Sequence, residues 1–181
     1  MNVYKFGGAS VKDADGVKNL FKIINTQREN LIIVVSAMGK MTDAFEVLCN
    51  AYFNKTGGTG EALQHIKEFH RQIICELFGE KSGEVEAACD KLYAELQRIL
   101  DGEPSLSYDY EYDQIISFGE LLSTTIVAAY LERQGRKAKF IDIRKCLITD
   151  QNYRNACVNM ELSQQLCQRT FTFQDTFMYI T

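Results

Sequence analysis

The sequence predicts a single α/β domain built around a mostly parallel β-sheet, and three neighbouring segments carry this prediction. Residues 2–6 form a short apolar run typical of a strand, and apolar residues at helical spacing predict a helix over residues 13–28. Residues 31–35 are the uninterrupted run Leu-Ile-Ile-Val-Val, typical of a strand buried inside a parallel sheet. Together they have the size of a right-handed strand–helix–strand crossover, and 181 residues fit one domain.

The middle of the chain is predicted to be helical. A helix follows the turn at residues 39–43, and two apolar stripes over about residues 61–101 predict a helical hairpin that turns at residues 79–83. Two further helices, over residues 109–118 and 120–133, are expected to meet at a glycine.

The last third of the chain returns to alternating strands and helices. The pattern predicts a strand over residues 139–142, a helix over 159–169 and a strand over 177–180. Because the last segment resembles an interior strand rather than a short or charged edge strand, we expect the domain to be incomplete at its C-terminus.

Composition excludes some classes of partner and compartment. The net charge of −4 and the pI of about 5.3 argue against a nucleic-acid backbone as the main partner. No apolar stretch is expected to reach the roughly 20 residues of a membrane helix, and no secretory signal is expected. The six cysteines contain no CxxC pair; three disulfides are possible, but buried thiols in the cytoplasm are the favoured interpretation.

The most informative segment is the N-terminal run Lys5-Phe6-Gly7-Gly8, in which a strand leads into a lysine and two glycines. Glycine lets the backbone approach a ligand closely, and its amides can hold an anion ahead of a helix. Lys5 adds a mobile positive charge suited to a phosphate or a carboxylate. A plain Gly-Gly turn beside an exposed lysine explains the same pattern equally well.

Two more segments carry candidate side chains. Ser36 and Thr42 flank a glycine-containing turn after the second strand, at the sheet edge where open α/β sheets bind ligands. The alternative is that Thr42 is only a helix N-cap. Glu120 follows Gly119 at an expected helix start, where it could face a pocket or simply stabilise the helix dipole.

Other candidate sites are weaker. Residues 55–60 resemble a phosphate loop but follow a helix and lack the Walker spacing, so a flexible turn is expected. His65 and His70 are five residues apart, which does not place both on one helical face as metal ligands.

Four motifs in order resemble those of the aspartokinases, which belong to the amino-acid-kinase family. Residues 5–11, Lys-Phe-Gly-Gly-Ala-Ser-Val, closely resemble the K-F-G-G-T-S-V opening of that family. Residues 35–42 resemble its V-S-A…G-x-T-N segment, residues 117–123 its S-x-G-E-x-x-S element, and residues 142–144 its D-x-R element. One such motif is weak, but four in the same order and spacing are specific.

The resemblance implies a three-layer α/β/α sandwich with a mostly parallel sheet, incomplete at the C-terminus. It also implies transfer of the γ-phosphoryl group of MgATP to the β-carboxylate of L-aspartate, the first step towards lysine, threonine and methionine. It assigns no protein ligand to a metal. By resemblance Lys5 is catalytic, the nucleotide contacts are Lys5, Phe6, Gly7, Gly8, Ser10 and Ser36, and the aspartate contacts are Ser36, Thr42 and Glu120.

The sequence departs from the family pattern at Ala9, where threonine is usual, and at Asp43, where asparagine is usual. The family's later G-R-G-G-S-D element, most of its nucleotide pocket and its regulatory ACT domains lie beyond residues 1–181. We therefore expect a partial catalytic domain that is inactive alone and homo-oligomeric in the full-length form. The alternatives are a related enzyme such as acetylglutamate kinase, or a non-catalytic ligand-binding domain on the same fold.

Overall fold

The computed structural model describes residues 1–27, 29–173 and 178–181, and its centre is a four-stranded sheet. The strands lie in the order β1-β2-β4-β3, and every neighbouring pair is parallel. All four therefore end at the same edge of the sheet, where their connecting loops meet. The strands are β1 (Asn2–Phe6), β2 (Leu31–Val35), β3 (Lys139–Phe140) and β4 (Met178–Ile180).

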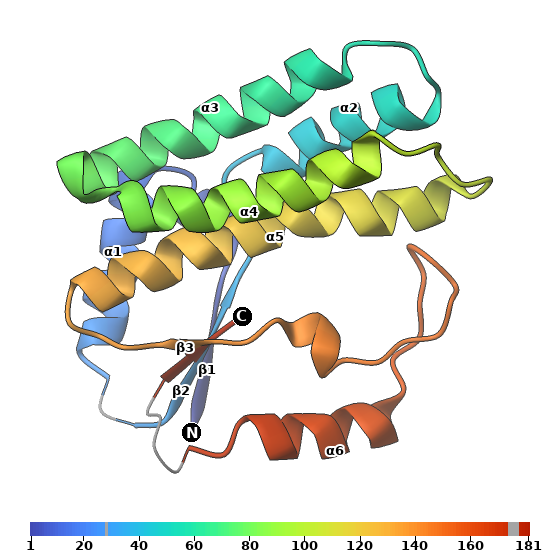
Figure 1. Cartoon of the computed structure of the whole chain (residues 1–181). Coiled ribbons are helices and arrows are strands. Elements are labelled where there is room, and N and C mark those ends of the chain that lie inside the picture. The colour runs from blue at the N-terminus through green and yellow to red at the C-terminus, as the bar shows by residue number, and fades with distance from the viewer. Residues whose placement is uncertain (28, 174–177) are drawn as a thin grey trace.

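Helices cover both faces of this sheet, which gives the three layers that the resemblance implied. α1 packs against α3 and α5, and α5 also packs on β2 and β3, so α1–α5 form one layer. α6 lies on the opposite side of the sheet (Figure 1). The helices are α1 (Ala14–Asn25), α2 (Met41–Phe53), α3 (Thr59–Phe78), α4 (Gly83–Leu100), α5 (Tyr108–Arg133) and α6 (Met160–Thr170), with short 3-10 turns at Gly8–Ser10, Gly79–Lys81 and Ile143–Lys145.

The last strand, β4, packs against hydrophobic side chains on both faces of the sheet. Met178 and Ile180 belong to the main core between the sheet and α1–α5. Tyr179 alternates to the other face, as β-strand geometry requires, and its ring packs edge-on against Phe171 and Phe173 after α6. β4 pairs with β2 on one side and β3 on the other, so the predicted interior position of this strand is confirmed. Residue 177, where the strand was expected to begin, lies outside the described residues.

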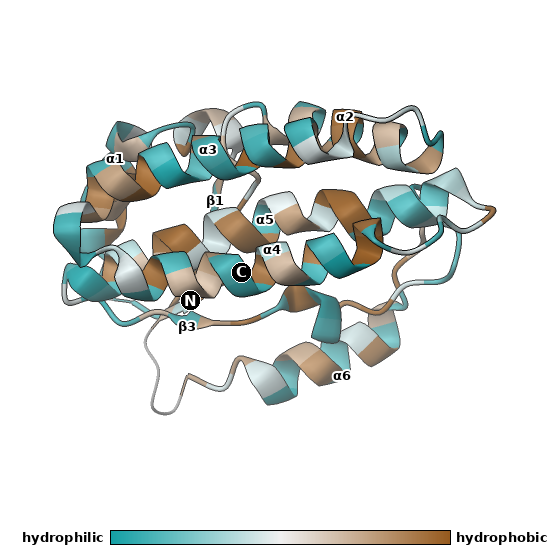
Figure 2. Cartoon of the chain, turned by 45° about the horizontal axis from the view of Figure 1, so that its top comes forward, coloured by the Kyte–Doolittle hydropathy of each residue, from teal (hydrophilic) through white to brown (hydrophobic). Residues whose placement is uncertain are grey.

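α3 and α4 form the predicted hairpin, with the turn at Gly79. Hydrophilic and hydrophobic residues alternate along both helices (Figure 2), as expected for helices with one face in the core. Residues 55–58 form the predicted turn, but residues 59–60, expected to belong to it, are the first two residues of α3. All six cysteines are free thiols: Cys49, Cys89 and Cys146 are buried as predicted, whereas Cys75 and Cys157 are exposed and Cys167 is half-buried.

The two predicted helices that meet at Gly119 are one continuous helix, α5. The glycine has a packing role instead of a breaking one, because a Cβ there would lie 3.0 Å from the Cβ of Ala37. Ser107 is the N-cap of α5, and its Oγ accepts a hydrogen bond from the Tyr110 N–H.

The continuity of α5 also corrects the expectation that no apolar stretch is long enough for a membrane. By length and composition alone this helix could cross one, and 61% of its apolar window is buried inside the protein. The central helix of a folded domain meets the same criteria, so this is weak evidence for a membrane span.

Smaller corrections concern the ends of elements. The helix expected over 13–28 ends at Asn25, and residue 28 lies outside the described residues. The strand expected over 139–142 stops at Phe140, because the Asp142 side chain accepts the Arg144 N–H and starts a 3-10 turn. Thr42 is not an N-cap: α2 begins at Met41, and Thr42 lies inside its first turn.

Candidate functional site

Two backbone loops meet at the carboxyl edge of the sheet, one after β1 and one after β2. The Gly39 N–H donates to the Gly8 carbonyl oxygen over 3.0 Å, and the Ser36 N–H donates to the Phe6 carbonyl over 3.0 Å. A Cβ on Gly8 would lie 2.6 Å from the Ala37 carbonyl oxygen and 2.9 Å from that of Gly39. Only glycine allows this approach, so Gly8 fixes the distance between the loops.

Lys5 lies beside these loops. Lys5 is an exposed residue of β1. Its Nζ lies next to Gly7, 3.7 Å from the position that a Cβ on this glycine would take. Within residues 1–27, 29–173 and 178–181 it takes part in no ion pair. The ammonium is therefore available to an anion bound at the glycine loop.

Glu120 lies in the middle of α5. The prediction that it stands at a helix start, facing a pocket or stabilising the helix dipole, is therefore wrong about its position. Its Oε1 accepts a hydrogen bond of 3.2 Å from the Ala37 N–H, and its other carboxylate oxygen has no partner among the described residues. One turn later, the Ser123 Oγ lies 2.8 Å from the Ser36 carbonyl oxygen, to which it donates. Two side chains of α5 thus hold the loop after β2.

A cleft of about 280 Å³ opens next to Glu120. α5 forms one wall, and the segment after β3 together with Thr181 forms the other. The Arg144 guanidinium holds both carboxylate oxygens of Asp142 at 2.9 Å, and its Nη1 lies 3.3 Å from the Ser117 Oγ. Hydrogen bonding from Arg144 lowers the pKa of Asp142, so this carboxylate stays ionised and keeps the guanidinium at the cleft. The lining residues are Ser117, Glu120, Leu121, Thr124, Phe140, Asp142, Ile143, Arg144 and Thr181.

The predicted site residues divide into two groups. Lys5, Gly7, Gly8, Ser36 and Glu120 lie together where the β1 and β2 loops meet α5.

The other three predicted residues have different surroundings. Phe6 is 8% exposed and belongs to the core. Ser10 and Thr42 are exposed, in the 3-10 turn after β1 and in the first turn of α2. None of the three lines the cleft, and their ligand roles stay predictions.

Ser117, Asp142 and Arg144 belong to two of the family-like motifs but had no predicted ligand role, and neither had Thr124; all four line the cleft. A signal for part of this set was present. Ser117, Glu120 and Thr124 have helical spacing, but an expected break before Glu120 separated the first of them from the others.

Residues 1–170 match the family model described as the amino acid kinase family. The chain belongs to the amino acid kinase family. The match covers every segment that forms the loops and the cleft except β4 and Thr181.

Curated relatives of this amino acid kinase chain include aspartokinases. It is 33% identical over 168 residues to aspartokinase 3, chloroplastic, of Arabidopsis thaliana, covering 85% of the chain and 28% of the plant protein. It is 29% identical over 160 residues to the aspartokinase of Chlamydia pneumoniae, covering 88% of the chain and 34% of that protein. The chain thus spans about a third of the length of these relatives.

Solved structures with the same fold include aspartokinase III of E. coli. Its R-state complex with aspartate and ADP superposes with a TM-score of 0.87 at 22% identity, over 99% of this chain and 39% of the bacterial one. Its T-state complex with lysine and aspartate gives a TM-score of 0.85 over 98% and 40% of the two chains. These likenesses establish the amino-acid-kinase fold of the chain.

Proposed function

We propose that this chain supplies the aspartate-binding part of an aspartate kinase, which transfers the γ-phosphoryl group of ATP to the β-carboxylate of L-aspartate. The observation that carries the proposal is the unpartnered carboxylate oxygen of Glu120, which lines the cleft opposite the Arg144 guanidinium. Asp142 already pairs with Arg144, so the charge left free in the cleft is that of Glu120, which suits the ammonium of an amino acid. The curated relatives named aspartokinase support the same substrate.

The charges and positions of these side chains suggest how L-aspartate would bind and react. The aspartate ammonium would pair with Glu120, while Ser36 and Thr42 would bind the substrate carboxylates or the transferring phosphoryl group. An oxygen of the β-carboxylate attacks the γ-phosphorus and forms the new O–P bond. The bond to the β–γ bridging oxygen breaks, and its electron pair leaves with ADP.

Lys5 and the glycine loop would neutralise the charge that builds up during this transfer. The Lys5 ammonium would lie between the attacking carboxylate and the phosphoryl group, and the Gly7 and Gly8 amides would bind phosphoryl oxygens. A phosphate group fits beside this loop because Gly7 leaves the space next to the Lys5 ammonium free of a side chain.

Magnesium would reach the site with the nucleotide. Among the residues that the structure describes, no group of three or more His, Cys, Asp or Glu side chains could hold a metal ion. The phosphate oxygens of ATP would therefore supply ligands for Mg²⁺, which would neutralise charge between the phosphates. Homo-oligomer formation, a cytoplasmic location and the lack of nucleic-acid or membrane partners belong to the same proposal.

A binding experiment tests the substrate directly, because the chain spans about a third of its relatives and turnover needs more than binding. The 181-residue chain would be titrated with L-aspartate, succinate and N-acetyl-L-aspartate while amide NMR shifts are recorded. We expect saturable shifts near residues 36–38 and 117–124 with L-aspartate, and binding at least tenfold weaker with the two ligands that lack the ammonium.

Equal binding of succinate or N-acetyl-L-aspartate would contradict the role of Glu120, and the second result would favour an acetylglutamate-kinase-like substrate. Transfer is tested in a longer form of the protein with ATP, L-aspartate and hydroxylamine, which traps an acyl phosphate as the hydroxamate. Binding without hydroxamate in that form would favour the non-catalytic alternative.

A further inference from the structure

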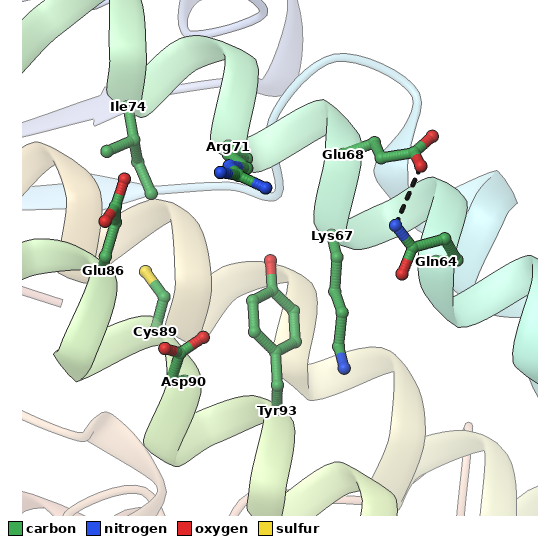
Figure 3. A pocket seen from close by; sticks show the side chains of 9 residues that line it. All are labelled: Gln64, Lys67, Glu68, Arg71, Ile74, Glu86, Cys89, Asp90 and Tyr93. Atoms are coloured by element: carbon green, nitrogen blue, oxygen red, sulfur yellow. Dashed lines mark hydrogen bonds between the residues drawn. The ribbon is translucent and has the colours of Figure 1, made fainter. Parts of the chain in front are cut away.

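A second concave site lies in the helical hairpin, away from the loops and the cleft described above. It is a groove of about 320 Å³ between α3 and α4 (Figure 3). The two helices leave room for it because α3 packs mainly on α2, whereas α4 packs mainly on α5. The volume is at the small end of the range for ligand sites and suits a molecule of a few heavy atoms.

The two walls of the groove carry opposite charges. Lys67 and Arg71 are one turn apart on α3, and Glu86 and Asp90 are one turn apart on α4. In the described part of the chain none of these four side chains forms an ion pair within 4.0 Å. The walls therefore face each other with opposite charges that do not neutralise one another directly.

Glu68 also lines the groove. Its Oε1 accepts a hydrogen bond of 2.8 Å from the Gln64 Nε2, as Figure 3 shows. Its charge still contributes to the field of the groove, which has two positive and three negative side chains in its lining.

The Tyr93 hydroxyl is the second, independent sign of a ligand. Tyr93 is only 7% exposed, yet its hydroxyl has no hydrogen-bond partner among the residues that the structure describes. It lines the groove and points towards Arg71 in Figure 3. Burial raises the pKa of this phenol, so it stays a neutral hydrogen-bond donor. A buried donor without an acceptor is costly, and a bound anion would satisfy it.

We propose that this groove binds a free α-amino acid at a site separate from the cleft at Glu120. The carboxylate lies against Lys67 and Arg71 and accepts the Tyr93 hydroxyl hydrogen, and the ammonium faces Glu86 and Asp90. Because the lining carries one negative charge in excess, an amino acid with a second ammonium is favoured over an acidic one. The proposal does not depend on the kinase function, since it concerns binding on the hairpin alone.

L-Ornithine is the probe that tests both charges. It carries the carboxylate and two ammonium groups, putrescine lacks the carboxylate, and L-glutamate reverses the side-chain charge. We expect saturable amide shifts confined to residues 64–74 and 86–93 of the 181-residue chain with L-ornithine. Putrescine and L-glutamate should bind at least tenfold more weakly.

Three variants locate the binding. Arg71→Gln removes one cation of the groove and should weaken L-ornithine binding at least tenfold, as loss of a charged hydrogen-bond partner does. Lys91→Gln removes one cation from an exposed position on α4 that does not line the groove, and should change binding less than twofold. Tyr93→Phe keeps the ring and should weaken binding about three- to tenfold.

Three results would overturn the proposal. The first is the absence of saturable shifts at 20 mM L-ornithine, and the second is equal weakening by Arg71→Gln and Lys91→Gln. The third is the absence of any response of residues 64–74 and 86–93 to L-ornithine in a longer form of the protein, because a protein segment would then occupy the groove.

Discussion

Replacing Glu120 with glutamine separates substrate binding from positioning of the β2 loop. Glutamine keeps a side-chain oxygen that can accept the 3.2 Å hydrogen bond from the Ala37 N–H, but it removes the negative charge. The free energy of unfolding should therefore change by less than about 0.5 kcal/mol. Loss of the partner of a bound ammonium should weaken L-aspartate binding by about 2–5 kcal/mol, which is roughly 30-fold or more.

Glu120→Ala gives the contrasting result, because it removes the acceptor as well. Ala37 is 1% exposed, so its N–H would be left buried and unpaired, at a cost of about 1–3 kcal/mol in the free energy of unfolding. Urea unfolding followed by circular dichroism and L-aspartate titration followed by NMR measure the two quantities. Glu132→Gln, at an exposed position in the last turn of α5, is the matched control and should change neither.

If the affinity of Glu120→Gln for L-aspartate is within threefold of that of the unmodified chain, Glu120 does not pair with the substrate ammonium. Glu120 would then only support the β2 loop, and a stability loss in Glu120→Ala alone would be its whole effect. The free carboxylate oxygen in the cleft would have no substrate role.

Three further predictions use the same chain. Gly8→Ala should lower the free energy of unfolding, measured in urea, by about 1–3 kcal/mol because the new Cβ meets backbone oxygens. Gly60→Ala is the control and should not lower it, because its Cβ would have no atom within 4 Å. Lys5→Ala is tested in a longer form of the protein instead, because most of the nucleotide pocket is expected beyond residues 1–181. It should weaken ATP binding measured by titration while the melting temperature stays unchanged, and Lys5→Arg should not restore binding, since a planar guanidinium does not replace a compact ammonium. Burial lowers the pKa of His70 to about 4, below its value in the unfolded chain, so the free energy of unfolding is highest above pH 6.5 and falls by up to about 3 kcal/mol as the pH drops to 4. His70→Gln should flatten this dependence in urea unfolding at several pH values, whereas His65→Gln, at an exposed position, should leave it unchanged.

The sequence predicted the parts of the fold that depend on local patterns. The strands at residues 2–6 and 31–35 have the predicted bounds: the second is an uninterrupted apolar run, and the two strands end before a glycine and a serine. The hairpin was equally clear, because each of its helices has a single apolar stripe. The strand order could not be derived in this way, since the pairing of β4 between β2 and β3 joins segments that lie far apart in the chain.

Gly119 shows why the candidate site was only partly predicted. Local rules treat a glycine between two helical patterns as a break, because glycine costs about 1 kcal/mol relative to alanine inside a helix. The contact that favours glycine there is with Ala37, which lies 82 positions earlier (119 − 37) and comes close only after the sheet has formed. Without that contact, the continuous helix and the true position of Glu120 could not be inferred.

Continuity of α5 gives its central turns two distinct faces, and the candidate site depends on both. Gly119 and Ser123, four residues apart, face the loop after β2: the glycine allows close approach, and the serine donates to a loop carbonyl. Ser117, Glu120 and Thr124 follow at spacings of three and four residues and line the cleft. A break at Gly119 would rotate Ser117 out of register with the other two. The uninterrupted helix is therefore what aligns the cleft wall while the glycine lets the loop reach the glutamate.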